Sequence, residues 1–102
     1  MWLETYRQKE SNMANTDFKG LREKLENSGE WPRVYFFKFI IPSDNKKLAK
    51  VEALFGPEAH VSIKQSHKGN YVSVSAKELM LSVDGVIERY KKASKIEGVM
   101  SL

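Results

Sequence analysis

The sequence predicts a single α+β domain: a four-stranded antiparallel sheet with helices packed on one of its faces. Segments in which apolar residues alternate, as in strands, are interleaved with segments in which they recur every three to four residues, as in helices. Gly and Pro stand at the boundaries between these segments, where they commonly end an element. The chain has 102 residues, of which 41% are hydrophobic. This length suffices for one domain with a buried core.

The N-terminal third of the chain is expected to be separate from this domain. Residues 1–16 show no apolar period and are expected to form a flexible tail. Residues 17–31 are expected to form a helix and a linker, because Phe18, Leu21 and Leu25 recur at spacings of three and four. Thr16 or Asp17 can cap this helix. Residues 32–102 then form the domain itself.

The strongest predicted strand covers residues 33–41, which are rich in aromatic and β-branched residues and are followed by Pro42. Alternation places two apolar sets on its opposite faces: Tyr35, Phe37, Phe39 and Ile41 on one, and Val34, Phe36, Lys38 and Ile40 on the other. A strand that is apolar on both faces is expected in the middle of a sheet. A helix is expected over residues 43–55, with Ser43 as its cap and Gly56 after its end.

Two alternating segments, residues 60–66 and 71–77, predict a hairpin. The turn that joins them reads His67, Lys68, Gly69 and Asn70, and Gly69-Asn70 is expected to supply positive φ. Val61 and Ile63 are expected to face inward. A second long helix is expected over residues 82–95 and a short last strand over residues 99–102.

The resulting order, βαββαβ, is that of the ferredoxin-like fold. Two right-handed crossovers place both helices on one face of the sheet and give the strand order 4-1-3-2. The other face is open. Alternation assigns these residues to it: Val34, Phe36, Lys38, Ile40, His60, Ser62, Lys64, Tyr71, Ser73, Ser75 and Lys77. Leaving its apolar members in water is unfavourable, so the N-terminal helix, a second copy or a partner is expected to cover them.

Residues 66–75, SHKGNYVSVS, resemble the hairpin of the YbeD-like family, small bacterial proteins of unknown function. Phe37-Lys38, residues 86–90 and the C-terminal strand also fit, so the resemblance spans residues 32–102. His67 stands where that family often has serine. The resemblance implies a ferredoxin-like fold and similarity to the ACT regulatory domains of amino-acid metabolism, hence a regulatory role. It implies no activity, ligand or catalytic residue.

Catalytic and metal signatures are weak throughout the chain. Without cysteine there is no disulfide or thiolate metal site, which fits a cytoplasmic location. His60 and His67 lack further ligands at a metal-binding spacing. The serines near His67 lack a supporting acid, and residues 41–45 lack the glycine-rich phosphate loop of acylphosphatases. No enzyme activity, metal or cofactor is therefore expected, and no apolar run approaches the roughly 20 residues that span a membrane.

Two functional hypotheses remain. Residues 32–102 carry twelve Lys or Arg against seven Asp or Glu, a net charge of +5. The leading hypothesis is a non-enzymatic, ACT-like regulatory or interaction domain that binds a small ligand or a protein partner, a homodimer included. The alternative is RNA binding through the lysines of the open face, although residues 68–72 lack the stacking aromatics of the RNA-recognition signature. The site residues common to both hypotheses are Phe36, Lys38, Lys64, Tyr71, Ser73, Ser75 and Lys77.

Overall fold

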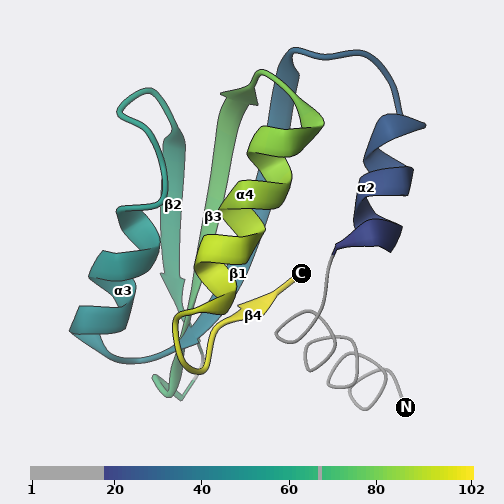
Figure 1. Ribbon diagram of the computed structural model, residues 1–102. Coiled ribbons are helices and arrows are strands. Elements are labelled where there is room, and N and C mark those ends of the chain that lie inside the picture. Colours follow the sequence, from purple (N-terminus) through teal and green to yellow (C-terminus); the bar gives the residue numbers. More distant parts are fainter. Residues whose placement is uncertain (1–17, 67) are drawn as a thin grey trace.

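The computed structural model describes residues 18–66 and 68–102 and shows an α+β fold (Figure 1). In chain order, its elements are α2 (Lys19–Glu26), β1 (Arg33–Pro42), α3 (Asn45–Glu52), β2 (His60–Gln65), β3 (Tyr71–Met80), α4 (Val83–Ser94) and β4 (Met100–Ser101). The predicted N-terminal tail and His67 lie outside the described residues. Within these ranges, no helix is both long and apolar enough to cross a membrane.

The sheet has the strand order β2-β3-β1-β4, and every neighbouring pair is antiparallel. This is the predicted order 4-1-3-2 read in reverse, so that prediction is confirmed. β1 is central, as its two apolar faces require. It pairs with β3 along its whole length, from Arg33 opposite Met80 to Pro42 opposite Tyr71. Its other neighbour, β4, pairs only beside Phe39 and Ile40.

β3 is three residues longer than the alternating segment 71–77 predicted. Glu78 has a low strand propensity, which made residue 77 the natural end of that pattern. The pairing overrides this preference, because Glu78 lies opposite Tyr35 and Leu79 opposite Val34. The extension adds a third exposed apolar residue, Leu79, beside Val34 and Phe36 on the open face.

The core lies between the sheet and the helices on one face. Phe37 and Phe39 are fully buried and stack on each other, with ring centroids 6.1 Å apart. Tyr90 of α4 packs against both rings, at 5.5 Å and 5.8 Å. The Tyr90 and Tyr35 hydroxyls hydrogen bond to each other at 3.1 Å. By contrast, the inward-facing Val61 and Ile63 remain half exposed, because β2 is an edge strand that the short α3 does not cover fully.

α3 starts and ends inside its predicted range of 43–55. Its cap is Asp44, not Ser43: the Asp44 carboxylate accepts hydrogen bonds from the backbone N–H groups of Lys46, at 2.8 Å, and Lys47, at 3.1 Å. Ser43 instead donates its backbone N–H to the carbonyl of Asn70, at 3.0 Å, which ties the end of β1 to the hairpin. The helix ends at Glu52, and a turn carries Phe55 into the core.

Asp44→Ala is expected to reduce stability at neutral pH. The backbone hydrogen bonds from Lys47 and Lys46 lower the pKa of Asp44 below its ordinary value of 3.8. A lowered folded-state pKa stabilises the protein above the unfolded-state pKa and loses this contribution as the pH falls through the folded-state pKa. The stability difference between the natural protein and the variant is therefore expected to shrink in acid. Urea unfolding from pH 7 to pH 3 measures it, and a constant difference would contradict the prediction.

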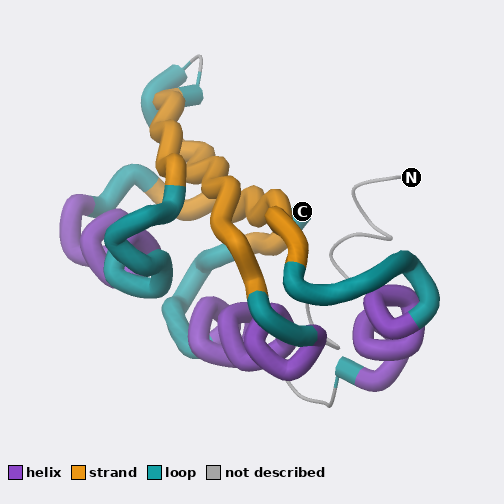
Figure 2. Tube along the Cα trace, turned by 90° about the horizontal axis from the view of Figure 1, so that it is seen from above, coloured by secondary structure: helices purple, strands orange, loops and turns teal. Residues whose placement is uncertain are grey.

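α2 lies in the same layer as the other helices and not over the open face (Figure 2). It packs beside α4, with an ion pair between Arg22 and Asp84, and its Phe18 and Leu25 are buried in the core. Trp31, after the helix, stacks on Tyr35, which faces the helices. Of the three candidate covers for the open face, the N-terminal helix is therefore excluded, because its apolar stripe packs on the helical side. The predicted caps, Thr16 and Asp17, lie outside the described residues.

The hairpin turn forms as predicted at Gly69, with one correction. Gly69 has a φ of +75° and donates its N–H to the carbonyl of Ser66 at 3.0 Å. Asn70 does not share the positive φ expected of it. The Ser66 hydroxyl accepts the N–H of Tyr71 at 3.1 Å, and the Ser66 N–H donates to the Tyr71 carbonyl at 2.8 Å. These bonds close the hairpin.

Candidate functional site

The open face of the sheet is the candidate site, and strand pairing determines which side chains meet on it. Residues directly opposite each other in an antiparallel pair share a face, with Cβ atoms roughly 5 Å apart. Pairing aligns three rows across β2, β3 and β1: His60, Lys77 and Phe36; Ser62, Ser75 and Lys38; Lys64, Ser73 and Ile40. Val34 lies opposite Leu79 and Tyr71 opposite Pro42 on the same face, so the predicted open-face residues share one side of the sheet.

One region of this face is polar and positively charged. We call it the cationic centre, and it consists of Lys38, Lys64, Lys77, Ser62, Ser73 and Ser75. Ser75 lies in its middle: Lys38 is directly opposite on β1, and Lys77 is two residues away on β3. Lys64 is the diagonal neighbour on β2, since its partner is Ser73. The three ammonium groups form no ion pair with a described residue.

A second region is apolar and lies where β1 begins and β3 ends. We call it the apolar end, and it consists of Val34, Phe36, Leu79 and Leu81. Their exposed fractions are 63%, 55%, 58% and 73%, in that order. Val34 and Leu79 are direct partners across β1 and β3, and Leu81 follows β3 immediately. None of the described elements packs over this region, which stands out because large apolar side chains are usually buried when they gather.

The predicted aromatic residues are not brought together. Tyr71 lies opposite Pro42, six residues along β1 from Phe36. At about 3.4 Å per residue, the two rings are roughly 20 Å apart, so they do not form one stacking platform. Phe36 instead has the ammonium of Lys77 at 6.0 Å from its ring centroid. Tyr71 stands with Lys68, Gly69 and Asn70 at the hairpin end of the sheet, apart from the cationic centre.

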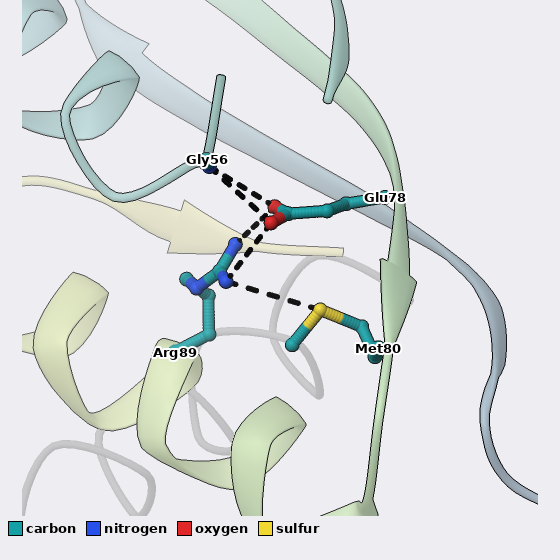
Figure 3. A network of polar contacts seen from close by, with 4 residues as sticks. All are labelled: Gly56, Glu78, Met80 and Arg89. Atoms are coloured by element: carbon teal, nitrogen blue, oxygen red, sulfur yellow. Dashed lines mark hydrogen bonds and ion pairs between the residues drawn. The ribbon is translucent and has the colours of Figure 1, made fainter. Parts of the chain in front are cut away.

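Sequence reasoning missed a polar network on the opposite, helical side of the sheet (Figure 3). The Glu78 carboxylate pairs with Arg89 of α4, at 2.6 Å, and accepts the backbone N–H of Gly56, at 3.3 Å and 3.4 Å. Both charged side chains are about five-sixths buried, at 15% and 16% exposed. The Arg89 guanidinium also lies over the rings of Phe37 and Phe55, at 5.4 Å and 5.5 Å.

This network joins β3, α4 and the turn after α3. A Cβ on Gly56 would lie 2.8 Å from the Glu78 carboxylate, so a larger residue would push this carboxylate away from the backbone N–H. The guanidinium and the carboxylate are each paired within the protein, by two hydrogen bonds to each other. A glutamate inside an otherwise alternating strand was the one signal in the sequence that pointed to it.

Two hollows indent the helical side. One lies beside the start of α3, between Asp44, Leu48 and Ile63, and the other lies between α2 and α4, beside Phe18 and Lys91. In residues 18–66 and 68–102, no three His, Asp or Glu side chains gather as metal ligands do. Comparisons of the chain with models of protein families, with curated proteins and with solved structures find no match.

Proposed function

We propose that this chain is a non-enzymatic interaction domain with a ferredoxin-like, ACT-like fold, which associates with a second copy of itself through the apolar end. The observation that carries the proposal is the exposure of Val34, Phe36, Leu79 and Leu81, more than half each, on a sheet face that α2 leaves uncovered. The resemblance of residues 66–75 to the YbeD-like hairpin supports the same fold and a regulatory role.

The area of the apolar end predicts a weak association. Burying a large apolar side chain completely contributes roughly 1.5–3 kcal/mol, so a half-exposed one contributes about half of that. Eight such side chains in two copies contribute about 9 kcal/mol in total. Loss of translational and rotational freedom costs at least about 4 kcal/mol. At most about 5 kcal/mol remains, which corresponds to a Kd on the order of 100 μM or weaker.

Charge determines which part of the open face can meet a second copy. A dimer centred on Ser75 would bring the lysines of two cationic centres together, without a carboxylate between them. The Val34–Leu79 pair lies four residues along the strands from the Lys38–Ser75 pair, which is about 13 Å. A two-fold axis through the Val34–Leu79 pair therefore places the two Lys38–Ser75 pairs about 26 Å apart, roughly three Debye lengths at physiological salt. The two Lys77 positions lie nearer, about 14 Å apart, which is still beyond one Debye length.

Sedimentation velocity between 10 μM and 1 mM protein tests the proposal. The average mass is expected to rise towards that of a dimer, and the double variant Val34→Ser/Leu79→Ser is expected to remain monomeric at 1 mM. These two residues are exposed, so the variant keeps its core. The control Val61→Ser/Ile63→Ser removes two apolar strand residues from the helical side, which are 39% and 46% exposed, and is expected to dimerise normally.

Two results would contradict self-association: a natural protein that stays monomeric at 1 mM, or a control variant that loses the dimer as fully as the first variant. Loss of the dimer in the control variant would mean that two copies associate through the edge strand β2.

A further inference from the structure

We propose that the cationic centre binds the phosphates of a single-stranded nucleic acid. This inference does not rest on self-association, because its phosphate site consists of Lys38, Lys64 and Lys77, and it shares only Phe36 with the apolar end. It concerns a binding site for a polyanion in the middle of the open face.

The first argument is the convergence of three lysines on Ser75. Directly opposed residues lie about 5 Å apart, and diagonal or next-but-one neighbours about 7 Å apart. Each lysine has a flexible four-carbon stem, so all three ammonium groups can reach one anion held above Ser75. The open-face positions that pairing assigns to β1, β2 and β3 include no carboxylate. An anion is therefore the group that relieves the mutual repulsion of the lysines.

The second argument is the set of hydroxyl groups between the lysines. Ser62, Ser73 and Ser75 form a diagonal band across β2 and β3, and none of their hydroxyls hydrogen bonds to a described residue. Serine hydroxyls donate hydrogen bonds to phosphate oxygens, alongside the charge of the lysines. Lysine ammonium groups and free hydroxyls together form the donor set that a phosphate requires.

The third argument concerns the kind of ligand that carries the phosphate. Small molecules bind in concave pockets, whereas both hollows described above lie on the helical side of the sheet. An exposed strand surface with lysines spread over three strands suits an extended polyanion. Phe36 favours a nucleic acid over an acidic peptide, because its half-exposed ring lies 6.0 Å from the Lys77 ammonium. A base can stack on this ring while the phosphate of the same nucleotide contacts Lys77. An acidic peptide has no base to stack on the ring.

Fluorescence anisotropy with a labelled, mixed-sequence single-stranded RNA of 12 nucleotides tests the site. The titration starts below 1 μM protein, where a dimer with a Kd near 100 μM is dissociated, so failure of self-association does not affect the result. If three lysines bind three phosphates, the logarithm of the association constant is expected to fall with the logarithm of the salt concentration, with a slope of about −2. Affinity is then expected to fall about 15-fold between 50 mM and 200 mM KCl.

Two triple variants separate the site from net charge. Lys38→Gln/Lys64→Gln/Lys77→Gln and Lys46→Gln/Lys50→Gln/Lys92→Gln both lower the formal charge from +4 to +1. The first set is expected to lose at least tenfold in affinity at 50 mM KCl and most of the salt dependence. The second set, on the outer surfaces of α3 and α4, is expected to lose less than threefold. Phe36→Leu is expected to lose about fivefold with an unchanged salt slope.

Three outcomes would overturn the inference. If both triple variants lose affinity equally, the RNA is attracted by the net charge of the protein, and the cationic centre is not a specific binding site. If a 12-residue polyglutamate displaces the RNA at equal concentration, the face binds an acidic protein surface. If the natural protein shows no binding at 50 mM KCl, the lysines hold no nucleic acid.

Discussion

Phe37→Ala is expected to lower the free energy of unfolding by about 4 kcal/mol, because it truncates a ring at the centre of the core. Phe37 is fully buried, and its ring contacts four other aromatic rings: Tyr35, Phe39, Phe55 and Tyr90. Removing it leaves a cavity in the centre of the core and also takes away the ring under the Arg89 guanidinium. Chemical denaturation followed by circular dichroism measures the loss.

The neighbouring residue provides a matched control. Phe36→Ala makes the same chemical change one position earlier, on a ring that is 55% exposed on the open face. Its expected effect on unfolding is below about 1 kcal/mol, the span of strand propensities. Equal effects at the two positions would mean that the register of β1 is shifted by one residue, since such a slip exchanges the two faces of a strand.

Arg89→Met is expected to cost about 3 kcal/mol, the second-largest effect. The methionine keeps an apolar contact with the rings of Phe37 and Phe55, so packing changes little. The Glu78 carboxylate, only 15% exposed, is left with the backbone N–H of Gly56 and no positive charge. Removing one partner of a buried pair is costly because the remaining charge is uncompensated.

The double variant Glu78→Gln/Arg89→Met tests this reason. Glutamine has the shape of glutamate and still accepts the Gly56 N–H, but it carries no charge. The double variant is therefore expected to be more stable than Arg89→Met alone, by about 1–2 kcal/mol. If the two substitutions simply add, the ion pair contributes nothing and the contribution of Arg89 is packing against the two rings.

The two regions of the open face divide the proposed roles between them. The apolar end lies where β1 begins, and the cationic centre lies across the middle of β1, β2 and β3. A second copy at the apolar end leaves Lys38 and Lys64 accessible, because the Val34–Leu79 pair lies about 13 Å along the strands from the Lys38–Ser75 pair. Phe36 belongs to the apolar end and lies opposite Lys77, so a second copy and a stacked base compete for its ring. Self-association and phosphate binding by the lysines are compatible, and separate variants test each of them.

The sequence predicted which residues lie on each face of a strand, because this depends only on the positions of neighbouring residues in the chain. A strand turns each successive side chain to the opposite side, so the sequence of β1 alone separates Phe37 and Phe39 from Phe36 and Lys38. The apolar character of both sets placed β1 in the centre of the sheet, and the element order predicted its neighbours. The open-face set of the site was predicted for the same reason.

Other features depended on contacts between distant parts of the chain. The pairing of β1 with β3 extended β3 to Met80, although Glu78 ended the local pattern. Ser75 became the centre of three lysines only through the register of three strands. The Glu78–Arg89–Gly56 network joins residues 11 and 22 positions apart. The periodicity of apolar residues does not predict such contacts, because it shows on which face of an element a residue lies but not which distant residue it meets.

The position of α2 shows most clearly the difference between what the sequence predicts and what the tertiary structure decides. Its apolar spacing, at Phe18, Leu21 and Leu25, determined that it is a helix with one buried stripe. Both faces of the sheet offered apolar surface to that stripe, so the sequence alone left the choice open. The tertiary structure decided it: the stripe packs beside α4, where Arg22 also meets Asp84. The apolar stripe of one short helix cannot cover both faces, so α2 leaves the open face, and with it the candidate site, uncovered.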